Sequence, residues 1–190
     1  MLNIVLFGPP GAGKGTQAER IKNKYSLIHL STGDIFRYNI KESTDLGVMA
    51  KEFMDKGELV PDEVTIKMLE LEVNKHSDSS GFIFDGFPRT THQAKALDDF
   101  LNSKNLSITK MIALEVPNDE LITRLLLRGK LSGRADDQDK SIIANRIKVY
   151  ENQTAVLAEY YKAQNKLATV NGVGSVDQIT ERLFSSIDIK

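Results

Sequence analysis

The sequence lacks several features that mark common classes of protein. It has no cysteine among its 190 residues, which excludes disulfide bonds, a thiol nucleophile and cysteine-ligated zinc. No apolar run approaches the roughly 18 residues of a membrane span, and the start of the chain is typical of a strand rather than of a secretory signal. The net charge of −1 provides no overall attraction to nucleic acid or to an anionic membrane. We therefore expect one cytoplasmic domain that binds small molecules, without a nucleic-acid or membrane partner.

A glycine-rich segment, GPPGAGKGT at residues 8–16, follows the apolar run Leu2–Phe7 and precedes a helical pattern. A strand, a glycine-rich loop and a helix in this order direct backbone N–H groups and the positive end of the helix dipole toward one point. Lys14 can reach the terminal phosphates of a nucleotide held there. The general phosphate-loop pattern has a hydroxyl residue after its lysine, whereas this chain has Gly15 there and Thr16 one place later, which argues against direct metal ligation by Thr16. The segment predicts a site for a nucleotide polyphosphate, and the lysine and strand disfavour the alternative of a turn without function.

Short apolar runs alternate with longer amphipathic stretches along the chain. The runs predict five strands, at residues 2–7, 27–30, 81–84, 110–116 and 167–170. The stretches between them predict helices, at 62–74, 91–101, 119–127, 140–164 and after Ser175. This alternation is typical of an α/β fold of the P-loop NTPase type, with a parallel five-stranded sheet flanked by helices and with ligands at the carboxyl ends of the strands. Residues 31–60 and 128–137 interrupt the alternation, and we expect them to be insertions over the sheet edge.

A second motif, FIFDGFPR, occupies residues 82–89. An aspartate at the end of a buried strand places its carboxylate beside the phosphate loop, where it can orient a magnesium ion or the waters around it. Asp85 is therefore the candidate on the metal side. The alternative is a simple turn, because Asp followed by Gly is a common turn signal.

Together these motifs resemble those of the adenylate kinase family over essentially the whole chain. The resemblance rests on GPPGAGKGTQ at residues 8–17, STGDIFR at 31–37 and DGFPR at 85–89, with support from GELVPD at 57–62 and GRADD at 133–137. In this family the order Lys14-Gly15-Thr16 is the expected one. The short passage from Arg128 to Asp139 resembles the short-lid form, which implies that no zinc is bound.

The resemblance implies the reaction ATP + AMP ⇌ 2 ADP, with magnesium accompanying ATP, a role in adenine nucleotide homeostasis, and a monomeric enzyme. It implies one kinase domain over residues 1–190, with a monophosphate-binding insertion at 31–60 and a mobile lid at 127–137. The residues expected to bind ATP are Gly11, Ala12, Gly13, Lys14, Gly15, Thr16, Arg128 and Gly174. Those expected to bind AMP are Thr32, Arg37, Glu58, Leu59, Val60, Gly86, Phe87, Pro88, Arg89, Gln93, Arg134 and Arg146. The catalytic set is Lys14, Arg89, Arg128, Arg134 and Arg146; Asp85 holds magnesium through water without ligating it directly, and Asp136 and Asp137 tether the closed lid.

Arginine chemistry supports these roles independently of the family. The planar guanidinium has paired donors that match phosphate oxygens, and phosphoryl transfer needs charge stabilisation more than it needs a protein nucleophile. Five of the chain's eight arginines fall in or beside the motifs above. Arg124 has a competing interpretation as a surface residue paired with a neighbouring acid.

Gln93 follows Arg89 by one helical turn, where its carboxamide can offer a donor and an acceptor to adenine. By the resemblance, pyrimidine monophosphate kinases usually have asparagine there and alanine in place of Thr32, so both positions favour AMP. A solvent-facing Gln93 is the alternative for this residue. For the whole chain the alternatives are a UMP/CMP kinase of the same fold or a non-catalytic nucleotide-binding scaffold.

Two further interpretations are disfavoured. A guanine-nucleotide switch would carry an Asn-Lys-x-Asp motif, but Asn23-Lys24 is followed by Tyr25-Ser26. The three histidines, His29, His76 and His92, have no spacing that suggests a metal site or a catalytic triad, so we expect them to be structural or exposed.

Overall fold

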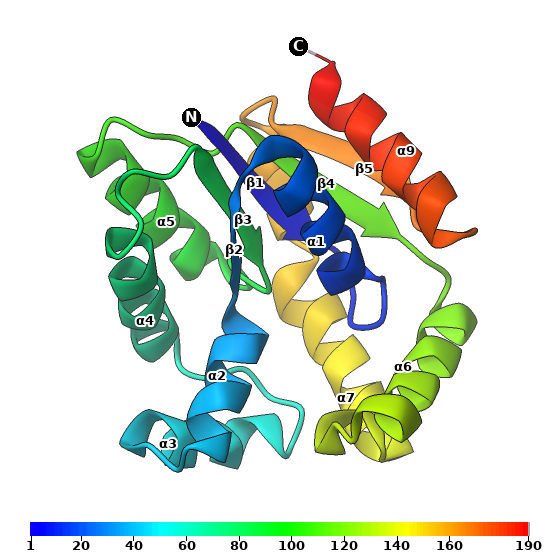
Figure 1. Cartoon of the computed structure of the whole chain (residues 1–190). Helices are drawn as coiled ribbons and strands as arrows, with labels where there is room; N and C mark the ends of the chain where they lie inside the picture. Colours follow the sequence, from blue (N-terminus) through cyan, green and yellow to red (C-terminus); the bar gives the residue numbers. More distant parts are fainter. Residues whose placement is uncertain (190) are drawn as a thin grey trace.

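Five parallel strands form one sheet in the order β2-β3-β1-β4-β5 (Figure 1). The structure is a computed structural model that describes residues 1–189. The strands are β1 (Leu2–Phe7), β2 (Ile28–Ser31), β3 (Gly81–Asp85), β4 (Lys110–Glu115) and β5 (Leu167–Asn171). Each lies within one residue of its predicted bounds, and the predicted fold class is confirmed. The register pairs Leu6 of β1 with Asp85 of β3 and with Ile112 of β4, so the carboxyl ends of the three central strands come together.

Helices cover both faces of the sheet, because successive side chains of each strand point to opposite faces and both sets are apolar. Ile4 and Leu6 of β1 pack in one core with α1 (Lys14–Tyr25) and α9 (Val176–Asp188). Val5 and Phe7 pack in the other core with α4 (Asp62–Asn74), α5 (Thr91–Ser103) and α8 (Leu157–Lys162). Ser175 begins α9 as predicted, with a reciprocal capping box to Gln178.

The expected insertion at residues 31–60 consists of α2 (Thr32–Lys41), α3 (Asp45–Met54) and the loop that follows. Helix α2 continues directly from β2, and the Ser31 hydroxyl caps it by accepting from the Asp34 N–H at 3.3 Å. Gly47 lets α3 approach the backbone of α2, because a Cβ there would collide with Asn39. The insertion shares a small core of its own with α4, built around Phe36, Ala50, Val60 and Met68.

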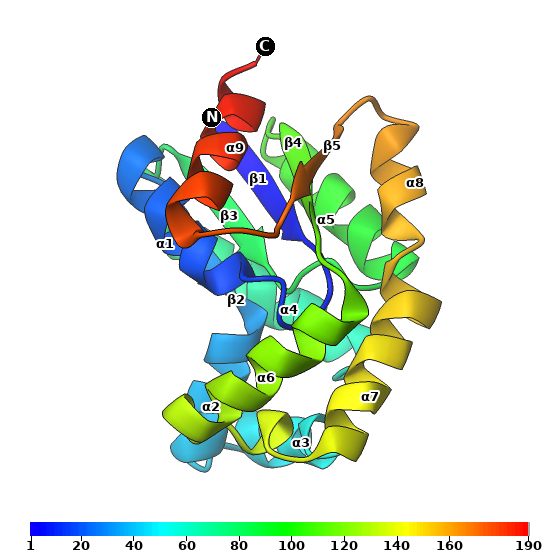
Figure 2. The ribbon, with the colours of Figure 1, turned by 90° about the vertical axis from the view of Figure 1, so that its right-hand side faces the viewer.

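The helix that precedes the second expected insertion is longer than predicted. The helix predicted to end at residue 127 runs on as α6 (Asn118–Ser132), so only a turn at Gly133 and the 3₁₀ turn η1 (Ala135–Asp137) remain outside it. Gly133 ends α6 in a left-handed conformation with φ 69°. Figures 1 and 2 show both insertions beyond the carboxyl ends of the strands rather than over a sheet edge, and β4, which leads into α6, is an inner strand.

The single helix predicted for residues 140–164 is interrupted. The structure has α7 (Lys140–Val149), a π-helical turn η2 (Tyr150–Thr154) and then α8. In the π turn the Ala155 N–H donates to the Tyr150 carbonyl five residues earlier, at 2.9 Å. The sequence has no glycine or proline there to signal the change. None of the helices in residues 1–189 is both long enough and apolar enough to cross a membrane.

Candidate active site

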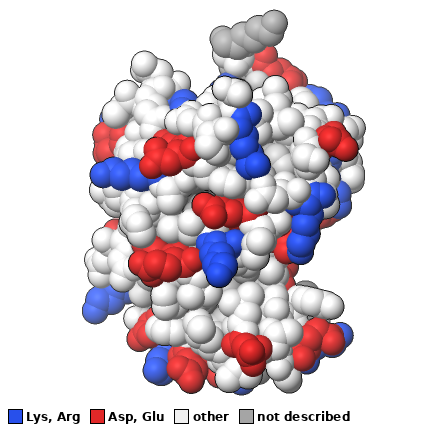
Figure 3. Space-filling view, turned by 90° about the vertical axis from the view of Figure 1, so that its left-hand side faces the viewer, with Lys and Arg blue, Asp and Glu red and all other residues white. Residues whose placement is uncertain are grey.

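A cleft of about 540 Å³ lies at the carboxyl ends of the strands, between the phosphate loop, the α2–α3 insertion and α6–α7. This volume falls in the range of about 300–1,000 Å³ that is typical of ligand sites. Its cationic side chains are Lys14, Arg37, Arg89, Arg124, Arg128, Arg134 and Arg146, and its carboxylates are Glu19, Asp34, Glu58, Asp85 and Asp136. On the face of the molecule shown in Figure 3, basic and acidic side chains lie interspersed. A chain with net charge −1 therefore concentrates cations around one cleft, as a polyphosphate site requires.

The phosphate loop forms the floor of the cleft and leads into the first turn of α1. Gly13 has φ 92° with open space around its Cβ position, so glycine is needed there for backbone conformation alone. At Gly8 a Cβ would lie 2.8 Å from the Leu114 carbonyl oxygen, so this glycine is needed for close approach to β4. Lys14 Nζ donates to the carbonyl oxygens of Gly8 at 2.7 Å and of Pro9 at 3.0 Å.

The pKa of Lys14 is unusually low for a lysine. Burial lowers it to about 8; the charge of Asp85 opposes this effect, and Arg89, Arg128 and Arg146 add to it. An ammonium crowded by three guanidinium groups is stabilised by an anion placed among them. The electrostatics of the floor therefore favour a phosphate group.

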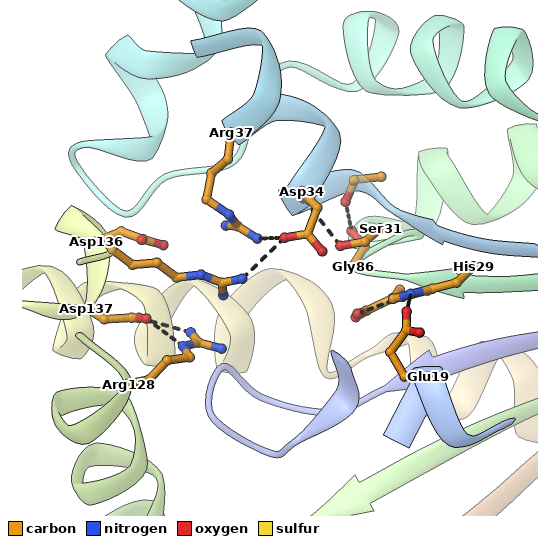
Figure 4. A network of polar contacts seen from close by, with 12 residues as sticks. Glu19, His29, Ser31, Asp34, Arg37, Gly86, Arg128, Asp136 and Asp137 are labelled. Carbon is orange, nitrogen blue, oxygen red and sulfur yellow. Dashed lines mark hydrogen bonds and ion pairs between the residues drawn. The ribbon is translucent and has the colours of Figure 1, made fainter. Parts of the chain in front are cut away.

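Asp85, at the end of β3, is buried and belongs to a chain of polar contacts (Figure 4). His29 on β2 bridges two carboxylates, with Nε2 3.3 Å from Asp85 Oδ2 and Nδ1 3.3 Å from Glu19 Oε1. Burial by itself would lower the pKa of His29, but the hydrogen bonds and charges of the two acids outweigh it and raise the pKa. The sequence predicted no partner for His29. Glu19 is 10 residues and Asp85 is 56 residues away along the chain, so no regular spacing indicated either contact.

Asp85 also faces the start of α1, where a Cβ on Gly15 would lie 3.8 Å from its Oδ2. Among residues 1–189 no group of three or more histidine, aspartate or glutamate side chains is placed to hold a metal ion. One carboxylate beside a phosphate loop fits magnesium that is coordinated mainly by phosphates and water.

Two arginines of the cleft are oriented by the completely buried Asp137 of η1. Arg128 on α6 donates from Nε to Oδ2 at 2.6 Å and from a terminal nitrogen to Oδ1 at 3.0 Å. Arg146 on α7 donates to the same Oδ1 at 2.5 Å and pairs with Asp136 at 2.9 Å. Burial alone would raise the pKa of Asp137, but Arg128 and then Arg146 outweigh it and hold this pKa below its ordinary value.

One ion pair joins the two insertions across the cleft. Arg134, which follows α6, lies 3.2 Å from Asp34 on α2, and the same carboxylate oxygen accepts from Arg37 at 2.5 Å (Figure 4). Arg134 and Asp34 both line the cleft, so this ion pair links two of its walls. Sequence reasoning did not assign a role to Asp34, because its partner is 100 residues away.

Arg89, in the loop between β3 and α5, lines the cleft. Its Nε donates to the Gly86 carbonyl at 2.7 Å, and Thr32 Oγ1 donates to the same oxygen at 2.9 Å. Burial lowers the pKa of Arg89 to about 10, with the charge of Arg146 as the next cause. Arg89 still carries its charge at neutral pH, in a position that favours an anion.

A narrow pocket of about 40 Å³ adjoins the cleft between α2, α4 and α5. Its lining contains the predicted AMP residues Thr32, Glu58, Leu59, Val60, Gly86, Arg89 and Gln93. Gln93 is only 1% exposed, so the alternative of a solvent-facing glutamine is wrong. Its Oε1 accepts from the Arg89 N–H and its Nε2 donates to Asp62 Oδ1, both at 2.7 Å.

The structure brings most predicted site residues to these two spaces. The others that line the cleft are Gly11, Gly13, Lys14, Gly15, Thr16, Arg37, Asp85, Phe87, Pro88, Arg128, Arg134 and Arg146. Two do not line either space: the side chain of Ala12, within the phosphate loop, is buried, and Gly174 lies in the turn between β5 and α9. Arg124 reaches the cleft and also fulfils its alternative interpretation, since it pairs with Glu120 at 2.9 Å.

The adenylate kinase family model matches residues 6–166 of the chain. The chain belongs to the adenylate kinase family. Adenylate kinases of Flavobacterium psychrophilum and Flavobacterium johnsoniae are each 61% identical to it over 188 residues, which is 99% of this chain and 99% of each relative. The adenylate kinase of Bacteroides fragilis is 49% identical over the same length, with the same coverage. The family and the ATP:AMP phosphotransferase activity predicted from the sequence are thereby confirmed.

Proposed function

We propose that this adenylate kinase transfers the terminal phosphoryl group of ATP directly to AMP inside the 540 Å³ cleft. The observation that carries the proposal is the convergence of Lys14, Arg89, Arg128, Arg134 and Arg146 on that cleft from five separate places in the chain. The cleft is lined by seven cationic side chains against five carboxylates, and this excess of positive charge matches the negative charge that spreads over a migrating phosphoryl group.

On the donor side, the loop from Gly11 to Thr16 holds the ATP phosphates through backbone N–H groups and the start of α1. Lys14 exchanges its contacts with the loop carbonyls for phosphate oxygens. Arg128 contacts the phosphates or the base, and the Gly174 backbone lies near adenine. Magnesium, when bound, would supply positive charge against the phosphates, and Asp85 would hold it through water.

On the acceptor side, the narrow pocket receives the AMP base against Thr32, Val60 and Gln93. Arg37 and Arg89 bind the AMP phosphate, supported by Arg134 and Arg146 on the opposite wall. Glu58, Leu59 and the segment Gly86–Pro88 complete this side. The acceptor oxygen is then directed at the donor phosphate from across the cleft.

Catalysis under this proposal consists of positioning, charge stabilisation and exclusion of water. Residues 31–60 and 127–137 act as the two closing parts. Asp137 keeps Arg128 of the lid and Arg146 of α7 oriented, and Asp136 adds a second ion pair to Arg146. Action as a monomer stays a prediction. The cytoplasmic location stays a prediction.

A ligand that joins two adenosines through a polyphosphate tests the two-nucleotide site. Occupying both halves of one closed state should raise Tm far more than ATP or AMP does alone. At 1,000 times Kd the stabilisation is about 4 kcal/mol, which for a chain of this size corresponds to about 8–16 °C. An equal shift with AMP alone would contradict the proposal.

A coupled assay with ATP and each of AMP, CMP, UMP and GMP tests the acceptor. We expect AMP to have the highest kcat/KM. Preference for a pyrimidine nucleotide would instead favour the UMP/CMP kinase alternative, and no turnover with any acceptor would favour the non-catalytic scaffold.

A further inference from the structure

The amide of Gln93 is held at both ends by groups that differ in hydrogen-bonding chemistry. Its oxygen accepts from the Arg89 main-chain N–H, and its nitrogen donates to the Asp62 carboxylate. A main-chain N–H can only donate, and an ionised carboxylate can only accept. Only one of the two amide orientations therefore satisfies both contacts, and the other would place two acceptors together and two donors together.

Asp62 is itself fixed in place. It is the first residue of α4, where the helix dipole favours a negative charge, and its side chain is 21% exposed. Its Oδ2 accepts from Thr90 Oγ1 at 2.6 Å, and Thr90 caps α5 by accepting from the Gln93 N–H at 3.1 Å. His92 Nδ1 lies 3.3 Å from the same Oδ2 on the outer side. The starts of two helices thus hold the carboxylate against the amide.

The remaining hydrogen-bonding capacity of Gln93 has a fixed direction in consequence. After the two protein contacts, the amide retains one N–H and one oxygen lone pair for a group in the pocket that it lines. Adenine has an amino donor at position 6 and an acceptor at N1. Hypoxanthine and guanine have a carbonyl acceptor at position 6 and a donor at N1, which is the reverse pattern.

We propose that Asp62 is a specificity-determining positioning residue, which locks the Gln93 amide in the orientation that accepts adenine and rejects 6-oxopurine monophosphates. The inference rests on the proposed function, in which Gln93 reads the base of AMP. A free amide could rotate by a half turn and serve either kind of purine. With Asp62 present, that rotation sets Oε1 against the carboxylate and the amide nitrogen against the Arg89 N–H, so binding a 6-oxopurine leaves buried groups unpaired.

The test is Asp62→Asn, which keeps the shape of the side chain but can accept or donate toward Gln93. Because the Arg89 N–H still opposes the rotated amide in this variant, we expect the ratio of kcat/KM for AMP to that for inosine monophosphate, measured with saturating ATP, to fall by about threefold to tenfold. The ratio for AMP over GMP should fall in the same direction. The change should come chiefly from a gain with the 6-oxopurines, which a merely structural role would not produce.

Two control variants separate the lock from general effects on the helix starts. Glu63→Gln removes one negative charge from the first turn of α4, at an exposed side chain with no hydrogen bond or ion pair among the described residues. His92→Asn removes the other contact of Asp62 Oδ2 without touching Gln93. Neither should change the AMP-to-inosine monophosphate ratio. If Asp62→Asn folds poorly, Asp62→Ser keeps a helix-starting residue that is too short to reach Gln93, and the same relaxation is expected.

Gln93→Leu distinguishes failure of this inference from failure of the proposed function. If Gln93→Leu leaves the ratio unchanged, Gln93 does not read the base and the proposed acceptor site is wrong. If Gln93→Leu changes the ratio but Asp62→Asn lowers kcat/KM equally for all purines, the lock is overturned and the acceptor site stands. The lock also requires Asp62→Asn to have no further effect on the ratio in the Gln93→Leu background.

Discussion

Replacing Asp137 with asparagine should weaken both the fold and the active site. The carboxylate is completely buried and accepts three hydrogen bonds from Arg128 and Arg146. Asparagine keeps the shape but removes the charge, and it turns a donor toward one of the guanidinium groups. Arg128 would lose its carboxylate partner and Arg146 would keep only Asp136, so the two guanidinium groups would repel each other with less compensation.

The expected loss of stability follows from burial and exposure. Breaking a buried ion pair by changing one partner costs about 3–5 kcal/mol. Arg128 is 37% exposed, so water screens part of its share, and we expect about 3 kcal/mol in total. For a chain of this length that corresponds to a fall in Tm of about 6–12 °C. Because Arg128 and Arg146 also lose their fixed orientation, kcat should fall about tenfold to a hundredfold.

Asp139→Asn is the matched control, because Asp139 lies two residues away, is exposed and caps α7 by accepting from the Ser141 N–H. Asparagine is an equally good cap, so this variant should behave like the parent. Chemical unfolding at pH 7 and a coupled ADP assay measure the two effects. If Asp137→Asn loses no more stability than Asp139→Asn, the buried carboxylate does not organise the arginines.

The pH dependence supplies a second check on Asp137. Its pKa in the folded protein is held below the ordinary 3.8, so its contribution to stability is present above 3.8 and is lost as the pH falls through the folded pKa. The difference in unfolding free energy between parent and Asp137→Asn should therefore be constant at neutral pH and shrink in acid. A difference that grew in acid would refute the assigned ion pairs.

Three other outcomes are expected. Lys14→Met should fold with a nearly unchanged Tm but lose about a thousandfold or more in kcat/KM, and near-full activity would remove Lys14 from the phosphate site; exposed Lys22→Met is the control. The pKa of Lys14 is about 8, and phosphates favour its charged ammonium form. ATP affinity should therefore be constant below about pH 8 and fall by up to about tenfold per pH unit above it. Titrations of ATP binding at about pH 6–9 measure this, and Lys14→Met should abolish the dependence. Asp34→Asn should shift Tm little, because its pair with Arg134 is partly exposed, but should speed proteolysis at residues 127–137; unchanged cleavage would exclude this pair as a lid contact.

Much of the fold was predictable from local pattern. The strands were predicted to within one residue because runs apolar on both faces, bounded by loops, have few other solutions in a chain of this size. Helix α4 begins after Pro61 and ends at Asn74 as predicted, and Ser175 caps α9, because both signals act within a single helical turn. The phosphate loop was predictable for the same reason, since its glycines, lysine and flanking strand are contiguous.

The errors in the helices have a different cause. Lys130 and Leu131 continue α6 beyond its predicted end, because only Gly133 supplies the left-handed residue that terminates it. The π turn at Tyr150–Thr154 joins α7, which packs against α6, to α8, which packs in the core on one face of the sheet. No residue type within the turn indicates this change of packing partner.

The sequence by itself determined the parallel sheet, the phosphate loop and the set of arginines, because contiguous residues or a regular period indicate each of them. Only the tertiary structure decided which partner each charged or amide group faces: His29 between Glu19 and Asp85, Asp137 between Arg128 and Arg146, and Asp62 against Gln93. These partners are from 9 to 56 residues apart in the chain, and hydrogen bonds depend on distances of a few ångströms and on direction. Such contacts exist only after the helices and strands have packed together, so a linear pattern does not contain them.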